Sequence, residues 1–185
     1  NNKDNFESGK LEAMNQLEID KSYYEINKEN WKILVLDSIQ SKTEGKGYQG
    51  KIDEKQFNWL KSRLEQSQVE QKFVMIVSHI PILSACVFLD GKNFKNGEWR
   101  VPETWMHGDA EELIELFDNY PNIKLAISGH IHLNDRIDYN SVTYFCNGAV
   151  SGNWWMGNYK KTAPGYALID LFPDGTFSNQ YLKYS

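Results

Sequence analysis

Three of the four histidines follow short apolar segments, and their types and spacing suit metal binding. The apolar segment 123–127 leads through Ser and Gly to His130 and His132, and the apolar segment 73–77 leads through Ser to His79. Neutral imidazole is the commonest nitrogen ligand for zinc, iron and related ions. Because side chains at i and i+2 of an extended chain point to the same side, His130 and His132 are expected to share one space. For the His-x-His pair alone, chance proximity of two loop histidines remains an alternative.

Two buried strands are expected to position these histidines. A short apolar run that ends in small residues is typical of a buried strand followed by a tight loop. In open α/β sheets, the functional crevice lies beyond the carboxyl ends of the strands. We therefore predict that strands at 73–78 and 123–128 are neighbours, and that His79, His130 and His132 meet at one rim.

The remaining patterns predict hairpins, helices and loops around this rim. Asp53 is predicted to cap a helix, in a capping box with Gln56, and Asp109 with Glu112 to cap a second helix. Apolar or alternating runs around turn residues predict antiparallel hairpins. Gly-rich or irregular stretches predict loops, of which 81–105 is expected to form one wall of a substrate cleft. The predicted hairpins cover 23–37, 135–146 and 166–183, and the predicted loops cover 41–50, 81–105 and 147–165.

The composition indicates one folded domain, residues 1–185. With 41% hydrophobic and 14% aromatic residues, the chain can bury a sizeable core. A net charge of −5 gives no electrostatic footprint for nucleic acid. No apolar run is long enough to span a bilayer, and no signal-peptide pattern is present, so the sequence leaves localisation open. The two cysteines make neither a disulfide framework nor a zinc ribbon.

The histidine motifs resemble the last two metal motifs of the calcineurin-like metallophosphoesterases. The matching segments are 78–81 (Ser-His-Ile-Pro) and 129–132 (Gly-His-Ile-His), and the resemblance runs from about Ser22 onward. It implies an α/β fold, namely half of a four-layer α/β/β/α sandwich with a mixed sheet and flanking helices. It also implies two divalent metal ions (Mn, Fe, Zn or similar), with His79 and His130 on one ion and His132 on the other.

The chain also departs from that family. The Asp-x-His, Gly-Asp and Gly-Asn-His motifs have no counterpart in a suitable context. We therefore expect the C-terminal part of a metallophosphoesterase, with the N-terminal half of the catalytic domain absent, and we assign no catalytic acid. The complete protein would hydrolyse a phosphate mono- or diester. This chain alone is expected to bind metal weakly or not at all and to hydrolyse nothing.

Three further residues are candidates for contacts with a phosphate-ester substrate. His107 lies in a loop that could overhang the cleft, although a histidine at a helix entry is the alternative. Asn153 and Trp154 lie in a Gly-rich loop after a predicted strand, where the indole would either stack on a substrate ring or pack the loop down.

Two other functions remain open from the sequence. One is a non-catalytic binding or scaffold module that keeps the phosphoesterase fold. The other is a mononuclear zinc domain with one structural ion, which would unfold on chelation. Because half of a sandwich would leave an apolar sheet face in water, we also expect self-association through that face, as a two-fold dimer.

Overall fold

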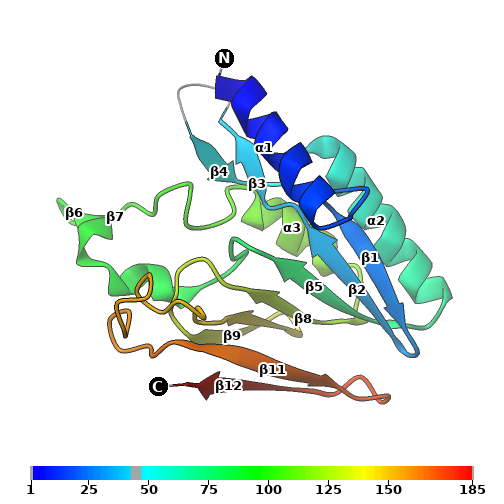
Figure 1. The fold of residues 1–185 in the computed structure, drawn as a ribbon. Coiled ribbons are helices and arrows are strands. Elements are labelled where there is room, and N and C mark those ends of the chain that lie inside the picture. Colours follow the sequence, from blue (N-terminus) through cyan, green and yellow to red (C-terminus); the bar gives the residue numbers. More distant parts are fainter. Residues whose placement is uncertain (1, 43–46, 185) are drawn as a thin grey trace.

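The structure is a computed structural model and describes residues 2–42 and 47–184. Its centre is a six-stranded mixed sheet (Figure 1). Its strands are β1 (Tyr24–Lys28), β2 (Trp31–Leu36), β5 (Phe73–Ser78), β8 (Ile123–Ser128), β9 (Asp135–Tyr139) and β10 (Val142–Cys146). They are ordered β1-β2-β5-β8-β10-β9. The central strands β2, β5, β8 and β10 run parallel, whereas β1 and β9 pair antiparallel at the edges. The prediction that 73–78 and 123–128 are neighbouring strands is confirmed.

Two helices cover one face of this sheet. They are α2 (Glu54–Val69) and α3 (Ala110–Phe117), and Figure 1 shows both on the same side of the strands. Leu60 and Leu64 of α2 and Leu113 of α3 have no solvent exposure and belong to one core cluster with side chains of β2 and β5. The apolar stripe of each helix is therefore buried against the sheet, as the spacing predicts.

A two-stranded hairpin covers the opposite face. It consists of β11 (Gly165–Leu171) and β12 (Phe177–Lys183) and lies across the sheet from the helices (Figure 1). Ile169 and Phe177 of the hairpin pack against a cluster that includes the buried Met75 and Leu125. The α/β fold with a mixed sheet and flanking helices is thus confirmed.

The far side of that hairpin carries exposed apolar side chains. Tyr166 and Leu168 of β11 are 51% and 47% exposed. The sheet face predicted to be open is thus partly covered by β11–β12, and apolar surface lies one layer further out. Self-association through this side remains a prediction.

The other elements surround the sheet. The helix α1 (Asn2–Gln16) lies across the side of the molecule that also carries β3 (Ile39–Ser41) and β4 (Tyr48–Gly50) (Figure 1). The predicted loop 41–50 is partly wrong, because β3 and β4 pair as a short antiparallel hairpin; residues 43–46 of it lie outside the described residues. The predicted loop 81–105 contains 3-10 turns at Ala85–Leu89 and Gly91–Asn93 and a hairpin of β6 (Phe94–Lys95) with β7 (Glu98–Trp99).

Two details of helix capping differ from the prediction. Asp53 caps α2, and its Oδ1 accepts the N–H of Gln56 at 2.7 Å, but the Gln56 side chain does not turn back to the cap. Instead the buried Gln56 amide bonds the backbone N–H and C=O of Asp37 at 2.8 and 3.0 Å, which holds the end of β2. Asp109 stands at the N-cap position of α3, as predicted, but its side chain makes no cap hydrogen bond. Its carboxylate is used by partners outside the helix.

Candidate metal centre

The carboxyl ends of the parallel strands are tied to one another by hydrogen bonds. Beyond β5, the N–H of Ile80 donates to Ser38 Oγ at 3.0 Å, which links the loop to the end of β2. The N–H of Gly129 donates to the carbonyl of His79 at 3.2 Å, which links the loops after β8 and β5. The loops that carry the candidate ligands thus form one connected rim, as expected at this edge of an α/β sheet.

His79 and His130 lie against each other on this rim. The Nε2 atom of His79 is 2.9 Å from Nδ1 of His130, and the ring centroids are 4.7 Å apart in an edge-to-face arrangement. Two imidazole nitrogens on one tetrahedral zinc ion, each about 2.0–2.1 Å from the metal, would be about 3.3 Å apart. A small separation of the two rings would therefore admit an ion between them.

Both rings are held in the form that binds metal. Loss of surrounding water lowers the pKa of His79, and a charge on His132 would lower it further. The pKa of His130 is lowered in the same way, first by burial and then by His79, against a smaller opposing effect of the Thr104 backbone. Since only neutral imidazole has the lone pair that coordinates a cation, these shifts keep the rings available as ligands near neutral pH.

His132 is oriented by the backbone rather than by another side chain. Its Nδ1 lies 2.6 Å from the carbonyl oxygen of Gly152, which can only accept, so Nδ1–H is the donor. That bond leaves the lone pair on Nε2. A carbonyl that fixes the tautomer of a ring in this way is a frequent outer partner of metal-binding histidines.

The backbone of the Gly-His-x-His loop differs from the extended chain assumed from the sequence. His130 and His132 have φ values of +66° and +60°, in the left-handed region that residues other than glycine seldom adopt. The i and i+2 argument was therefore wrong in its geometry. His130 faces His79, whereas His132 faces Gly152 and Trp154. Strained backbone of this kind is typical of functional sites.

Aromatic side chains from β4 and from the loop between β10 and β11 border the histidines. The Tyr48 ring lies edge-on to His130, with centroids 6.2 Å apart. The indole of Trp154 is tilted by 33° over His132 at 4.8 Å, and Tyr159 lies 6.0 Å from the same ring. Trp154 is 61% exposed, so its outer side faces solvent beside the site. Asn153 precedes it, half-buried, and its backbone N–H donates to the Gly157 carbonyl at 2.9 Å.

His107 lies apart from the rim, inside the protein. Its side chain has no exposure, and Nδ1 lies 2.8 Å from Oδ1 of Asp109. Nε2 lies 3.4 Å from Ser78 Oγ, one residue before His79, and the His107 N–H donates to the Pro81 carbonyl at 3.0 Å. These contacts attach His107 to the residues on both sides of His79, namely Ser78 and Pro81. The structure does not bring this ring to a surface where a substrate could reach it.

The interactions that support the site join residues far apart in the sequence. Ser38 is separated from Ile80 by 42 residues, Ser78 from His107 by 29, and His132 from Gly152 by 20. Sequence reasoning missed them, since no local spacing signals such pairs. Only the Ser that precedes His79 could have drawn attention, as a hydroxyl beside a candidate ligand.

Comparisons with known proteins point in the same direction as this geometry. The chain is 26% identical over 156 residues to the 3',5'-cyclic adenosine monophosphate phosphodiesterase CpdA of Escherichia coli, covering 82% of this chain and 50% of that protein. It is 27% identical over 157 residues to a 3',5'-cyclic-nucleotide phosphodiesterase of Nostoc, covering 82% of this chain and 52% of the relative. No family model matches.

The fold is shared with solved structures. A dimetal phosphatase from Danio rerio superposes with a TM-score of 0.50 at 17% identity, over 68% of this chain and 49% of that one. GAP50, described as the anchor in the inner membrane complex of Plasmodium, superposes with a TM-score of 0.52 at 18% identity, over 87% of this chain and 49% of that one. The chain is related to the calcineurin-like metallophosphoesterases.

Two further observations concern the length of the chain and its helices. The chain spans about half the length of the curated relatives that it matches. Among residues 2–42 and 47–184, no helix has the length and apolar character needed to cross a bilayer.

The residues present fit the nitrogen side of a metallophosphoesterase centre. The three imidazoles have the right donor chemistry, in that two neutral rings face each other and a third has its tautomer fixed by a carbonyl. Within the described part of the chain, however, no group of three or more His, Cys, Asp or Glu side chains could hold an ion. His79 and His130 are thus paired at the rim, whereas neither His132 nor an oxygen donor forms a group of three with them that could hold an ion.

Proposed function

We propose that this chain supplies the histidine ligands of a two-metal phosphoesterase. His79 and His130 would bind one divalent ion, and His132 would bind the other. The observation that carries the proposal is the 2.9 Å hydrogen bond between His79 Nε2 and His130 Nδ1, which brings imidazoles from two separate strand ends together. In this pair one neutral ring donates its N–H to the other, and a cation between the rings would replace that hydrogen bond and coordinate both facing nitrogens.

The proposed reaction is hydrolysis of a phosphate mono- or diester by the complete protein. Two divalent ions, when bound, would supply Lewis-acid activation of the phosphate group. The names of the sequence relatives favour a diester, and in particular a cyclic nucleotide, as the substrate. The metals would be Mn, Fe, Zn or similar ions, all of which accept imidazole.

This chain's own residues would hold and orient the substrate. Trp154 lies over His132 with an open outer side, so it would cover one side of a bound ester, and the adjacent Asn153 would offer an amide to it. Tyr48 lies beside His130. A substrate contact by His107 was also predicted, and it would require the buried ring to leave Asp109. We therefore assign His107 to support of the His79 loop.

Metal titration of the chain tests the proposal. The three imidazoles do not complete a coordination shell, so we expect Mn²⁺ and Zn²⁺ to bind weakly, with dissociation constants on the order of 10 μM or higher. We also expect no hydrolysis of bis(p-nitrophenyl) phosphate by this polypeptide alone. Absence of saturable binding in calorimetry, or binding unaffected by replacement of all three histidines, would contradict the assignment.

A non-catalytic binding module is the second candidate. It is favoured by the lack of a grouped set of three or more ligands among the described residues, and GAP50, an anchor by description, has a similar fold. The two candidates differ in what metal does. A phosphoesterase centre predicts that bound metal raises the affinity for phosphate, whereas a scaffold predicts that metal leaves phosphate affinity unchanged.

A further inference from the structure

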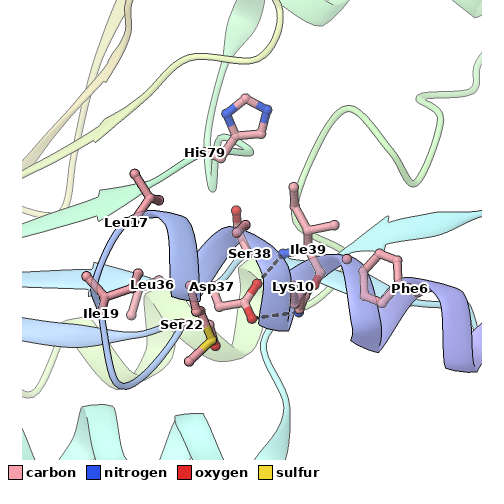
Figure 2. A pocket seen from close by; sticks show the side chains of 13 residues that line it. Phe6, Lys10, Leu17, Ile19, Ser22, Leu36, Asp37, Ser38, Ile39 and His79 are labelled. Carbon is pink, nitrogen blue, oxygen red and sulfur yellow. Dashed lines mark hydrogen bonds and ion pairs between the residues drawn. The ribbon is translucent and has the colours of Figure 1, made fainter.

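A cavity of about 520 Å³ lies between α1 and the carboxyl ends of β2 and β5 (Figure 2). His79 lines it on the side opposite α1, so the cavity reaches one of the proposed metal ligands. Its volume falls in the range of sites that bind small molecules, about 300–1,000 Å³. No residue of α1 was predicted to contribute to the site.

The walls of this cavity are mainly apolar. One wall is a stripe of α1, and the other is formed by residues at the end of β2 and in β3. The apolar side chains are Phe6, Ala13 and Met14 on the helix, Leu17 and Ile19 in the turn that follows it, and Leu36 and Ile39 on the strands. A phenyl ring and a thioether both make favourable contacts with an aromatic group, through ring packing and sulfur–ring contact.

The charges inside the cavity are matched to each other. Lys10 Nζ lies 2.6 Å from Asp37 Oδ2 and donates to the Ile39 carbonyl at the same distance (Figure 2). The ammonium and the carboxylate cancel, so the body of the cavity has no net charge to hold an ion. Ser22 adds a hydroxyl group to the lining, which can bond to a ring nitrogen or a carbonyl. The cavity therefore suits an uncharged group with a few polar atoms.

We propose that this cavity holds the uncharged aromatic group of the phosphate ester, while the phosphate lies beside His79 and His130. A nucleobase is one group of that kind. The inference rests on the proposed function, because the metal centre would fix the phosphate end. It adds a specificity site formed largely by α1. The helix would select esters by the organic group that is linked to the phosphate.

Paired phosphonates test the proposal without a chemical reaction. Phenylphosphonate and methylphosphonate have the same anionic headgroup, resist hydrolysis and differ by an aromatic ring. With the full chain in Mn²⁺, we expect phenylphosphonate to bind at least tenfold more tightly in calorimetry. We also expect the methyl resonance of Met14 to shift in NMR spectra with phenylphosphonate and to remain in place with methylphosphonate.

Two tryptophan variants of α1 locate the ring. Ala13→Trp would fill the cavity and is expected to remove the tenfold preference, with methylphosphonate binding unchanged. Asn15→Trp places the same side chain at an exposed position that does not line the cavity, and it should keep the preference. The Met14 shift in the unaltered chain decides the matter even if Ala13→Trp does not fold.

The outcomes separate the cavity from the metal centre. If metal binds through the histidines and the chain shows no preference for the ring, or keeps its preference in Ala13→Trp, the cavity proposal is overturned. A Met14 shift and a ring preference that persist although no metal binds would support the cavity and contradict the proposed function.

Discussion

One buried histidine, His107, and one pair of surface histidines, His79 and His130, differ in what each ring faces. His107 is fully buried and faces the carboxylate of Asp109, with Ser78 on its other nitrogen. His79 and His130 lie at the surface of the rim and face each other, without a carboxylate partner. A ring with a carboxylate on one nitrogen and a hydroxyl on the other has its hydrogen-bonding needs met by the protein. Two neutral rings in contact leave a lone pair for a ligand from outside.

This comparison separates structural from functional histidines by partner chemistry rather than by burial alone. If it is correct, substitutions of His79 or His130 alter metal affinity with little change in the free energy of unfolding. Substitutions of His107 or Asp109 lower the free energy of unfolding with little change in metal affinity. The four predictions below test that division.

The largest effect is expected at the rim. His130→Asn removes one nitrogen of the facing pair but keeps a residue type that tolerates the left-handed backbone. Affinity for Mn²⁺ or Zn²⁺ should fall about 100-fold, since loss even of an outer partner costs 10- to 100-fold. The free energy of unfolding without metal should change by less than about 0.5 kcal/mol. His107→Asn is the matched control, with the opposite pattern, and equal metal loss in both variants would remove the distinction between the two kinds of histidine.

The next effect concerns stability. Asp109→Asn removes the carboxylate that faces His107 Nδ1 and accepts the N–H of Ile52 at 2.9 Å. Because both partners lie in the interior, unfolding free energy should fall by about 2 kcal/mol in chemical denaturation. Metal affinity should change less than threefold. Asp138→Asn, at an exposed carboxylate paired with Arg136, is the control that should change stability little.

The same carboxylate predicts a pH dependence. Burial alone would raise the pKa of Asp109, but hydrogen bonds from His107 and from the Ile52 N–H outweigh it and leave the pKa below the ordinary value. A carboxyl with a lowered folded-state pKa contributes stability above its unfolded pKa, about 3.9, and loses it as pH falls through the folded pKa. Denaturation from pH 7 to pH 2 should therefore show a shallower acid loss in Asp109→Asn. Parallel curves for the two proteins would refute this.

The smallest effect is expected at the aromatic border. Trp154 packs over His132, whereas its neighbour Trp155 is 76% exposed. Trp154→Ala should weaken metal binding by a few fold, since ring packing contributes about 0.5–1.5 kcal/mol. Trp155→Ala should leave metal affinity unchanged. Equal effects of the two variants in calorimetry would show that Trp154 has no particular role.

The strands and the approach of His79 to His130 follow from the sequence, because apolar runs that end in small residues specify buried strands. Parallel strands place their carboxyl ends at one edge, which brings together residues 51 positions apart. Asp109 was correctly predicted at the start of α3, but its side chain lacks the expected cap hydrogen bond because long-range partners compete with the local one. Nothing near Asp109 in sequence indicates that its carboxylate binds Ile52, 57 residues away.

The cavity beside His79 was also beyond sequence reasoning. The recurrence of Leu11, Met14 and Leu17 predicts a short amphipathic helix near the start of the chain. The structure has the helix α1 there, but Leu11 is 60% exposed and Leu17 lies beyond the end of the helix, so the predicted apolar stripe is not buried. Where that helix lies depends on contacts such as Lys10 with Asp37, which no local pattern encodes. Likewise, the left-handed backbone of His130 and His132 has no marker in the residue types, because histidine is not a residue that such positions require.

That left-handed loop has a consequence for how a cation would be received. Holding two non-glycine residues in an unfavourable conformation costs on the order of 1–3 kcal/mol each, and this cost is met when the chain folds, before any ion arrives. Association would then need little further ordering of the loop, so capture should be fast and nearly free of conformational entropy loss. Glycine at either position would relieve the strain in the empty protein, and the same substitution would deprive the arriving ion of a donor.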